Sequence, residues 1–218
     1  NAGIVQRGRV ADAAALEQVI RALFASVSPR PLVPTRIAFG LPECQVYTRV
    51  FTLPVHAKRA RDRLVFEEAW KSIPVPGNEL RFAYQSREET GDRVEVVLVA
   101  AERAVVEEWE FFFQRMGITI ASIDAELFAV FRGVMVHMPA APVCGVDCGG
   151  AATTIAGFDA RGLRYSHAVR IAGDAITDAI ASQLHVSVAE AEEKKRTFDF
   201  AQSDRAMVAA VERAIAPL

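Results

Sequence analysis

The sequence lacks the features that would place it in a specialised class. Only three of its 218 residues are cysteine, an odd number that argues against a disulfide framework and favours a reducing compartment. No apolar run reaches the roughly 18 residues of a membrane span, and no signal peptide is recognisable. Neither sign of charge is in excess, since the formal net charge is −2, so no nucleic-acid-binding face is expected. The composition, 51% hydrophobic and 24% charged, is that of a globular protein.

The most informative stretch runs from Val143 to Thr154 and reads Val-Cys-Gly-Val-Asp-Cys-Gly-Gly-Ala-Ala-Thr-Thr. A short strand is expected first, and then Asp147 and the Gly149–Gly150 pair at a bend. Glycine lets the backbone approach an oxyanion closely and point its N–H groups at it. Thr153 can donate a hydroxyl, and Asp147 can hold Mg²⁺ directly or through water. The pattern predicts a phosphate-binding loop, with a plain β-hairpin as the alternative.

The segment from Val143 to Arg196 resembles the second half of actin-like ATPases and, within them, the PilM proteins of type IV pilus assembly. The stretches that carry the resemblance are Val146–Thr153, Arg161–Leu163, Arg170–Thr177 and Ser187–Lys195. Two positions depart from the family pattern. Cys148 stands where an aliphatic residue is usual, and Ala172 stands where a glycine is usual, which would make that turn less permissive.

The resemblance implies a site for ATP and Mg²⁺. Asp147, Gly149, Gly150 and Thr153 would form the second phosphate loop, with Asp147 holding the metal. Glu192 and Lys195, from an Ala-Glu-x-x-Lys element, would lie near the nucleoside. From local spacing alone these two residues would instead belong to a solvated helix surface.

The order of strand and helix patterns indicates an α/β fold. By resemblance it is the two-lobed actin-like ATPase (ribonuclease H-like) fold with a small inserted α+β subdomain. The chain does not begin with methionine, and we expect a piece of a longer protein, truncated at both ends. The expected division is residues 3–42 with 98–142 as the incomplete first-lobe subdomain 1A, 43–97 as the inserted subdomain 1C, and 143–218 as the start of the second lobe, 2A and 2B.

Individual elements follow from periodicity and from caps. Strands are expected at 3–6, 9–10, 36–40, 46–53, 80–88, 93–101 and 118–123 and in the hairpin from Val143 to Val169, those at 36–40 and 118–123 being buried. Helices are expected from Asp12, over 56–73, 102–116 and 127–136, from Gly173, from Ser187 and around 207–215. A capping box of Ser187 and Glu190 and a linker at 139–142 complete the pattern.

The resemblance implies a cytoplasmic component of the type IV pilus inner-membrane assembly platform, held at the membrane through its partners. It would bind ATP and the cytoplasmic tail of a PilN-like protein, with other platform proteins and a second copy of the chain as further partners. Any ATPase activity would be weak. This chain is expected to be inactive and to bind ATP poorly, because the opposing phosphate loop and the adenine-holding Gly-Gly loop are not found in it.

Two other classes of function stay open at this stage. An FtsA-like division protein or a GspL-like type II secretion platform protein would share the fold. A sugar-kinase-like phosphotransferase would need a catalytic base, for which Asp124 is the best-placed carboxylate.

The partner tail is expected in a groove between the first lobe and the inserted unit. The strand around 46–53 should present an edge there, on which an extended peptide could pair. The residues assigned to this groove are Arg36, Thr48, Arg49 and Val50.

Overall fold

The computed structural model describes residues 3–54, 61–88, 91–134 and 141–217. Contacts divide the chain into two compact units, which are described separately below. The first unit comprises Asn1–Ala141 together with Asp159–Tyr165, and the second comprises Pro142–Phe158 together with Ser166–Leu218. The division into subdomains that the sequence suggests stays a prediction. Its expected boundary at residue 98 falls inside a strand, and residues 139 and 140 of the expected linker lie outside the described residues.

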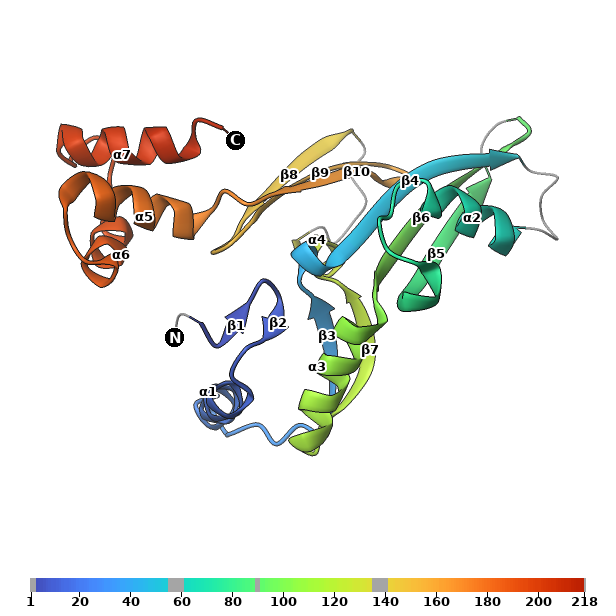
Figure 1. The fold of residues 1–218 in the computed structure, drawn as a ribbon, viewed down its shortest axis with the longest axis horizontal. Helices are drawn as coiled ribbons and strands as arrows, with labels where there is room; N and C mark the ends of the chain where they lie inside the picture. Colours follow the sequence, from blue (N-terminus) through green and yellow to red (C-terminus); the bar gives the residue numbers. More distant parts are fainter. Residues whose placement is uncertain (1–2, 55–60, 89–90, 135–140, 218) are drawn as a thin grey trace. The chain divides into compact units, whose positions relative to one another are not determined.

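The first unit contains a parallel strand pair packed against helices (Figure 1). Its elements are β1 (Val5–Gln6), β2 (Arg9–Val10), α1 (Ala13–Ala25), β3 (Arg36–Leu41), α3 (Arg103–Arg115), β7 (Thr119–Ala125) and α4 (Glu126–Val134). Asp12 begins α1, because its carboxylate accepts a hydrogen bond from the Ala15 N–H at 2.9 Å. The apolar face of α3, around Trp109 and Phe113, forms the centre of this core, against which Phe39 stacks.

The strands at 36–40 and 118–123 exist, but the prediction that they are buried is wrong. In β3 and β7 as the structure has them, only the last residues, Leu41 and Ala125, are buried, and Ile118 is buried just before β7. The reason lies in the sheet: among the described residues β3 and β7 pair only with each other. Neither strand is therefore enclosed on both sides, as an inner strand of a parallel sheet would be.

The inserted part of the first unit is an antiparallel sheet in the order β4-β6-β5, covered on one face by a helix (Figure 1). Its elements are β4 (Val46–Pro54), α2 (Arg61–Trp70), β5 (Leu80–Glu88) and β6 (Arg93–Glu102), with short 3₁₀ turns η1 (Glu43–Gln45) and η3 (Gly77–Glu79). Side chains alternate between the two faces of each strand, and Val94, Val96 and Leu98 of β6 pack beneath α2. The expected helix ends at Trp70, and its residues 56–60 lie outside the described residues.

The second unit contains a three-stranded sheet in the order β10-β9-β8 and three helices. Its elements are β8 (Val143–Cys148), β9 (Thr153–Asp159), β10 (Gly162–Val169), α5 (Gly173–Leu184), α6 (Val188–Arg196) and α7 (Arg205–Ile215). The tip of the β9–β10 hairpin is assigned to the first unit. The capping box is confirmed on its serine side, where Ser187 Oγ accepts the Glu190 N–H at 3.2 Å.

Candidate functional site

The loop between β8 and β9 has the geometry of an oxyanion cradle. The Gly149 N–H donates to the Ala152 carbonyl at 3.0 Å, which closes a tight bend. A Cβ on Gly149 would lie only 3.0 Å from that carbonyl, so the bend favours glycine. Within the described part of the chain, the N–H groups of Gly150, Ala151 and Ala152 make no hydrogen bond to protein. Three consecutive backbone donors are thus available to an anion such as a phosphate.

The start of α5 holds this loop in place. The Gly173 N–H donates to the Gly149 carbonyl at 3.1 Å, and the Asp174 N–H donates to the Gly150 carbonyl at 2.8 Å. A Cβ on Gly173 would lie 3.3 Å from the Gly149 oxygen and 3.3 Å from Lys195 Nζ. Position 173 therefore favours glycine for lack of space. Ala172 has a φ of −162°, an extended conformation open to any residue, so the departure from the family pattern does not strain the turn.

Thr153 and Asp147 flank the loop on the two strands. Thr153 is 1% exposed, and its hydroxyl donates to the Ile171 carbonyl at 2.6 Å, so in this structure it joins β9 to the segment before α5. Asp147 is half-buried on β8, opposite Thr154. No group of three His, Cys, Asp or Glu side chains able to hold a metal occurs among the described residues. Asp147 therefore suits Mg²⁺ only as one contact of an ion that is also held by phosphate oxygens and water.

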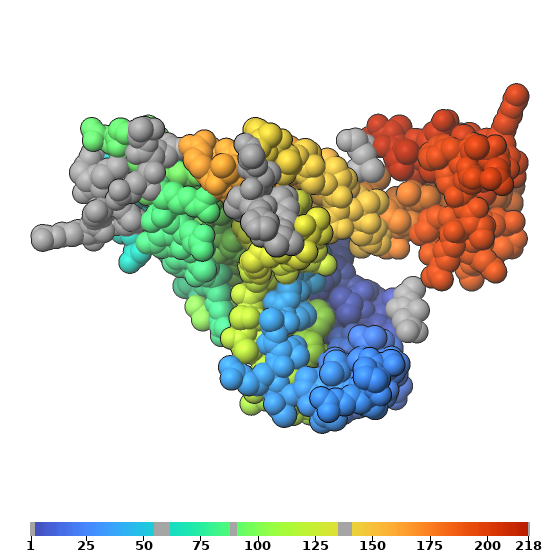
Figure 2. Space-filling view, turned by 180° about the vertical axis from the view of Figure 1, so that it is seen from behind, coloured from blue at the N-terminus to red at the C-terminus, as the bar shows by residue number. Residues whose placement is uncertain are grey.

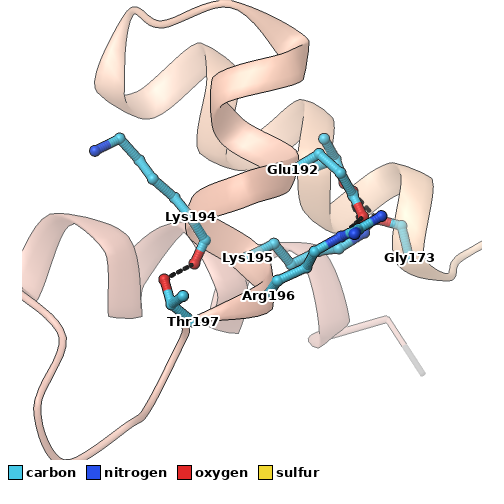
Figure 3. A network of polar contacts seen from close by, with 7 residues as sticks. Gly173, Glu192, Lys194, Lys195, Arg196 and Thr197 are labelled. Carbon is cyan, nitrogen blue, oxygen red and sulfur yellow. Dashed lines mark hydrogen bonds and ion pairs between the residues drawn. The ribbon is translucent and has the colours of Figure 1, made fainter.

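Glu192 and Lys195, which the sequence places on α6, meet at the start of α5 (Figure 3). Lys195 Nζ lies 2.6 Å from Glu192 Oε2 and donates to the Gly173 carbonyl at 3.1 Å. It also donates to Thr177 Oγ1 at 2.8 Å. The hydrogen bond from Lys195, followed by that from Thr177, lowers the pKa of the Glu192 carboxyl from 4.5 to about 2. The pair is thus tied to the glycine that also holds the loop after β8.

Sequence reasoning missed Gly173 and Thr177 as members of this site. The stretch Arg170–Thr177 had been recognised as family-like, but only as the start of a helix. The sequence did carry one signal for Thr177: it lies on the same helical stripe as the buried Ile180. A hydroxyl in a buried position needs a hydrogen-bond partner, so a polar contact could have been expected there.

The first unit contains a cavity of about 540 Å³ on the face of the inserted sheet opposite α2. Figure 2 shows the green surface of β5 and β6 beside the yellow-green surface of β7 and α4, the two regions that line it. The walls are largely apolar: Leu41, Val46, Ala83, Val97, Val99, Ala101, Val106, Ile123 and Phe128 contribute, with Arg81, Asp124 and Arg132 as charged members. Both arginines are ion-paired, Arg81 with Glu110 at 2.8 Å and Arg132 with Asp124.

The structure places the four residues expected in the partner groove at different sites. Thr48 and Val50 of β4 lie opposite Val99 and Val97, two residues that line the cavity, so they share its face of the sheet without lining it. Thr48 Oγ1 is buried and has no hydrogen-bond partner among the residues that the structure describes. Arg49 points to the other face and donates to Ser72. Arg36 is exposed at the start of β3 and does not line the cavity.

Asp124 is the penultimate residue of β7 and lines the same cavity. Its carboxylate accepts the Ala125 N–H at 2.9 Å and forms an ion pair with Arg132. Asp124 is thus a polar part of the cavity wall that is already engaged by Arg132.

Comparison with known families decides where the chain belongs. The family model described as type IV pilus assembly protein PilM matches residues 1–210. The chain belongs to the PilM family. No curated protein matches this PilM-family sequence significantly. Among the described residues, every helix is too short or too polar to cross a membrane.

Solved structures show that this PilM-family chain has the actin-like ATPase fold. A chain of a structure described as a PilM-PilN type IV pilus biogenesis complex superposes with a TM-score of 0.80 at 22% identity, over 100% of this chain and 63% of that one. The ethanolamine utilization protein EutJ of Carboxydothermus hydrogenoformans gives 0.55 at 17% identity, over 98% and 56%. The cytoplasmic domain of EpsL, an inner-membrane component of the Vibrio cholerae type II secretion system, gives 0.51 at 12% identity, over 90% and 65%. The chain thus spans less than two thirds of each solved chain.

Proposed function

We propose that this PilM-family protein captures the cytoplasmic tail of a PilN-like inner-membrane protein in the cavity between β5–β6 and β7–α4. The observation that carries the proposal is that cavity, which is about 540 Å³ in volume and largely apolar. The similar structure described as a PilM-PilN complex supports the choice of partner. The protein would then lie at the cytoplasmic side of the inner membrane, held there by its partner. Binding to other platform proteins and self-association stay predictions. The family match favours pilus assembly over the division, secretion and sugar-kinase alternatives.

The edge of β5 is the surface on which the tail would pair. β5 has only β6 as a neighbour among the described residues, so its other edge is unpaired there. Five consecutive residues, Arg81 to Gln85, line the cavity. Consecutive strand residues point to opposite faces, so a cavity that touches all five runs along the strand edge. An extended tail could pair with this edge and place alternate side chains in the cavity.

The lining of the cavity favours the edge of β5 over the edge of β4, which the sequence analysis selected. β4 contributes only Val46 to the lining. The charged side chains in the lining are already paired: Arg81 with Glu110, and Arg132 with Asp124. A tail with apolar side chains would therefore fit better than an acidic one, because it would leave these ion pairs intact.

A nucleotide at the loop after β8 would complete the proposed function. The N–H groups of residues 150–152 would bind phosphate oxygens, with Gly149 shaping the bend. Near the nucleoside, Glu192 would offer an acceptor that suits a sugar hydroxyl, and Lys195 would hold that carboxylate in place. Mg²⁺, when bound with ATP, would offset phosphate charge, and Asp147 is the carboxylate that would hold it. Hydrolysis would be slow at most, and the nucleotide would tune partner binding.

Peptide binding to the full-length protein tests the proposal. The fluorescence anisotropy of a labelled PilN-like tail peptide should rise when the peptide binds. Ala83→Trp fills the cavity from β5 and should weaken binding at least about tenfold, because the bulky ring takes the place of the tail side chains. Ala22→Trp, on the exposed side of α1, is the matched control and should bind as the parent does. Equal binding by both variants would place the tail elsewhere.

A further inference from the structure

The hydroxyl of Thr177 is the centre of a four-membered polar cluster in the second unit. Thr177 lies on α5 and is 4% exposed. Its Oγ1 is 2.7 Å from Glu192 Oε2, 2.8 Å from Lys195 Nζ and 3.0 Å from the Gly173 carbonyl oxygen. One side chain of α5 thus contacts two charged residues of α6, Glu192 and Lys195, and the glycine that holds the loop after β8.

We infer that Thr177 is a positioning residue, which together with Lys195 fixes Glu192 as a preformed acceptor for a sugar hydroxyl of a nucleotide. The inference rests on the proposed nucleotide function and deepens it. Thr177 itself would not touch the ligand, because it is buried beneath the pair.

The donors and acceptors of the cluster assign each proton. Lys195 has three N–H donors, and its three acceptors are Gly173 O, Thr177 Oγ1 and Glu192 Oε2. The single Thr177 proton then goes to Glu192 Oε2, since a carboxylate is a stronger acceptor than the Gly173 carbonyl and is closer. Lys195, Thr177 and Glu192 therefore form one directed chain of hydrogen bonds.

This arrangement leaves one carboxylate oxygen for a ligand. Among the described residues, Glu192 Oε1 has only a long contact, 3.4 Å, from Arg196 Nε (Figure 3). The side chains of Glu192 and Lys195 are 37% and 22% exposed, so solvent reaches the pair. A sugar hydroxyl could donate to Glu192 Oε1 without breaking the contacts to Thr177. Holding two flexible side chains in place beforehand lowers the entropic cost of binding them.

The test compares ATP with 2′,3′-dideoxy-ATP on the full-length protein. The parent should bind ATP about tenfold more tightly, since a hydrogen bond to a charged group has roughly that effect. Thr177→Val keeps the shape but removes the hydroxyl, and should lower ATP affinity about tenfold while changing dideoxy-ATP affinity less than about twofold. Thr177→Ser restores the hydroxyl and should retain the preference. Thr197→Val is the control, because that hydroxyl donates to the Lys194 carbonyl, outside the cluster.

A second readout needs no nucleotide. NMR titration of the Glu192 carboxyl should show its pKa raised in Thr177→Val and kept low in Thr177→Ser and Thr197→Val. If Thr177→Val weakens both nucleotides equally, or if the parent binds ATP and dideoxy-ATP alike, the inference is wrong even though nucleotide binding stands. If the parent binds neither, the proposed nucleotide function fails. The titration alone then decides whether Thr177 positions the pair. If the pKa of Glu192 is the same in Thr177→Val as in the parent, the positioning role is wrong.

Discussion

Arg164 of β10 forms an ion pair with Glu95 of β6, a glutamate whose side chain is only 3% exposed. Arg164 Nε also lies 3.5 Å from Asp159 Oδ2. A carboxylate removed from water needs its counter-charge, because desolvation costs several kcal/mol. Nearby, a Cβ on Gly162 would lie 3.1 Å from the Arg87 guanidinium. The hairpin tip is thus anchored on the inserted sheet by charge and by close contact, all within the first unit.

Breaking this pair on one side should destabilise the protein more than replacing both members. Arg164→Met leaves Glu95 buried without its partner and should lower the free energy of unfolding by about 2–4 kcal/mol. Adding Glu95→Met should recover most of that loss, since an apolar pair has no charge to desolvate. Urea unfolding of the two single variants and the double variant gives the coupling energy. Simple additivity of the two single effects would show that the pair contributes nothing.

Gly77 is packed beneath the indole of Trp70. A Cβ at this position would fall within the van der Waals volume of the Trp70 ring, which also contacts Phe66 at 3.6 Å between centroids. Gly77→Ala should therefore displace the ring and cost about 1–3 kcal/mol. Tryptophan fluorescence should report the shift along with a lower unfolding midpoint. Gly133→Ala, where a Cβ meets open space, should be neutral or stabilising. A Gly77→Ala protein as stable as the parent would contradict this packing.

Glu43 should make stability depend on pH. Burial, with a smaller effect from Glu126, raises the pKa of its carboxyl from 4.5 to about 7, although the Leu127 N–H opposes the shift. The folded state therefore binds the proton more tightly than the unfolded state. Stability from this group is complete below pH 4.5 and is lost as pH rises to 7.

Glu43→Gln should remove that dependence. The free energy of unfolding of the variant minus that of the parent should be larger at pH 8 than at pH 5, by up to about 3 kcal/mol. Urea unfolding at the two pH values measures the difference, with Glu193→Gln, at an exposed position, as the control. The same pH dependence in Glu43→Gln and the parent would mean that Glu43 titrates normally.

Local patterns were sufficient for the elements that depend on near neighbours in the chain. The 3.6-residue stripe of Val105, Trp109 and Phe112 predicted α3, and these side chains are buried in its core. Ser187 was recognised as a cap because its partner is three residues away. The glycines of the loop after β8 were recognisable for the same reason.

Features that depend on distant segments were not predictable. Thr177 gains its role from residues 15 and 18 positions later, on another helix. The cavity collects residues from β3 to α4, which no single stretch reveals. Burial of β3 and β7 was overestimated, because an apolar run does not show how many strands lie beside it. Family resemblance, not local spacing, singled out Glu192 and Lys195.

ATP binding by the 218-residue chain should be weak. The described residues supply one proposed phosphate loop, after β8, and the Glu192–Lys195 pair. A dissociation constant near 1 μM needs about −8 kcal/mol, more than one loop of backbone donors is expected to provide. Titration calorimetry with Mg²⁺ and ATP should give a constant well above 1 μM or no detectable heat. Sub-micromolar binding would mean that the chain holds nucleotide contacts beyond those described above.

Hydrogen exchange of the full-length protein, with and without a PilN-like tail peptide, tests the central claim most directly. If the tail pairs with the edge of β5, outward N–H groups within Arg81–Gln85 should exchange more slowly when the peptide is present, because they become hydrogen-bonded. The β4 edge around Thr48–Val50 should not change. Protection of β4 with no change along β5, or no protection of either edge by a bound peptide, would contradict capture of the tail in this cavity.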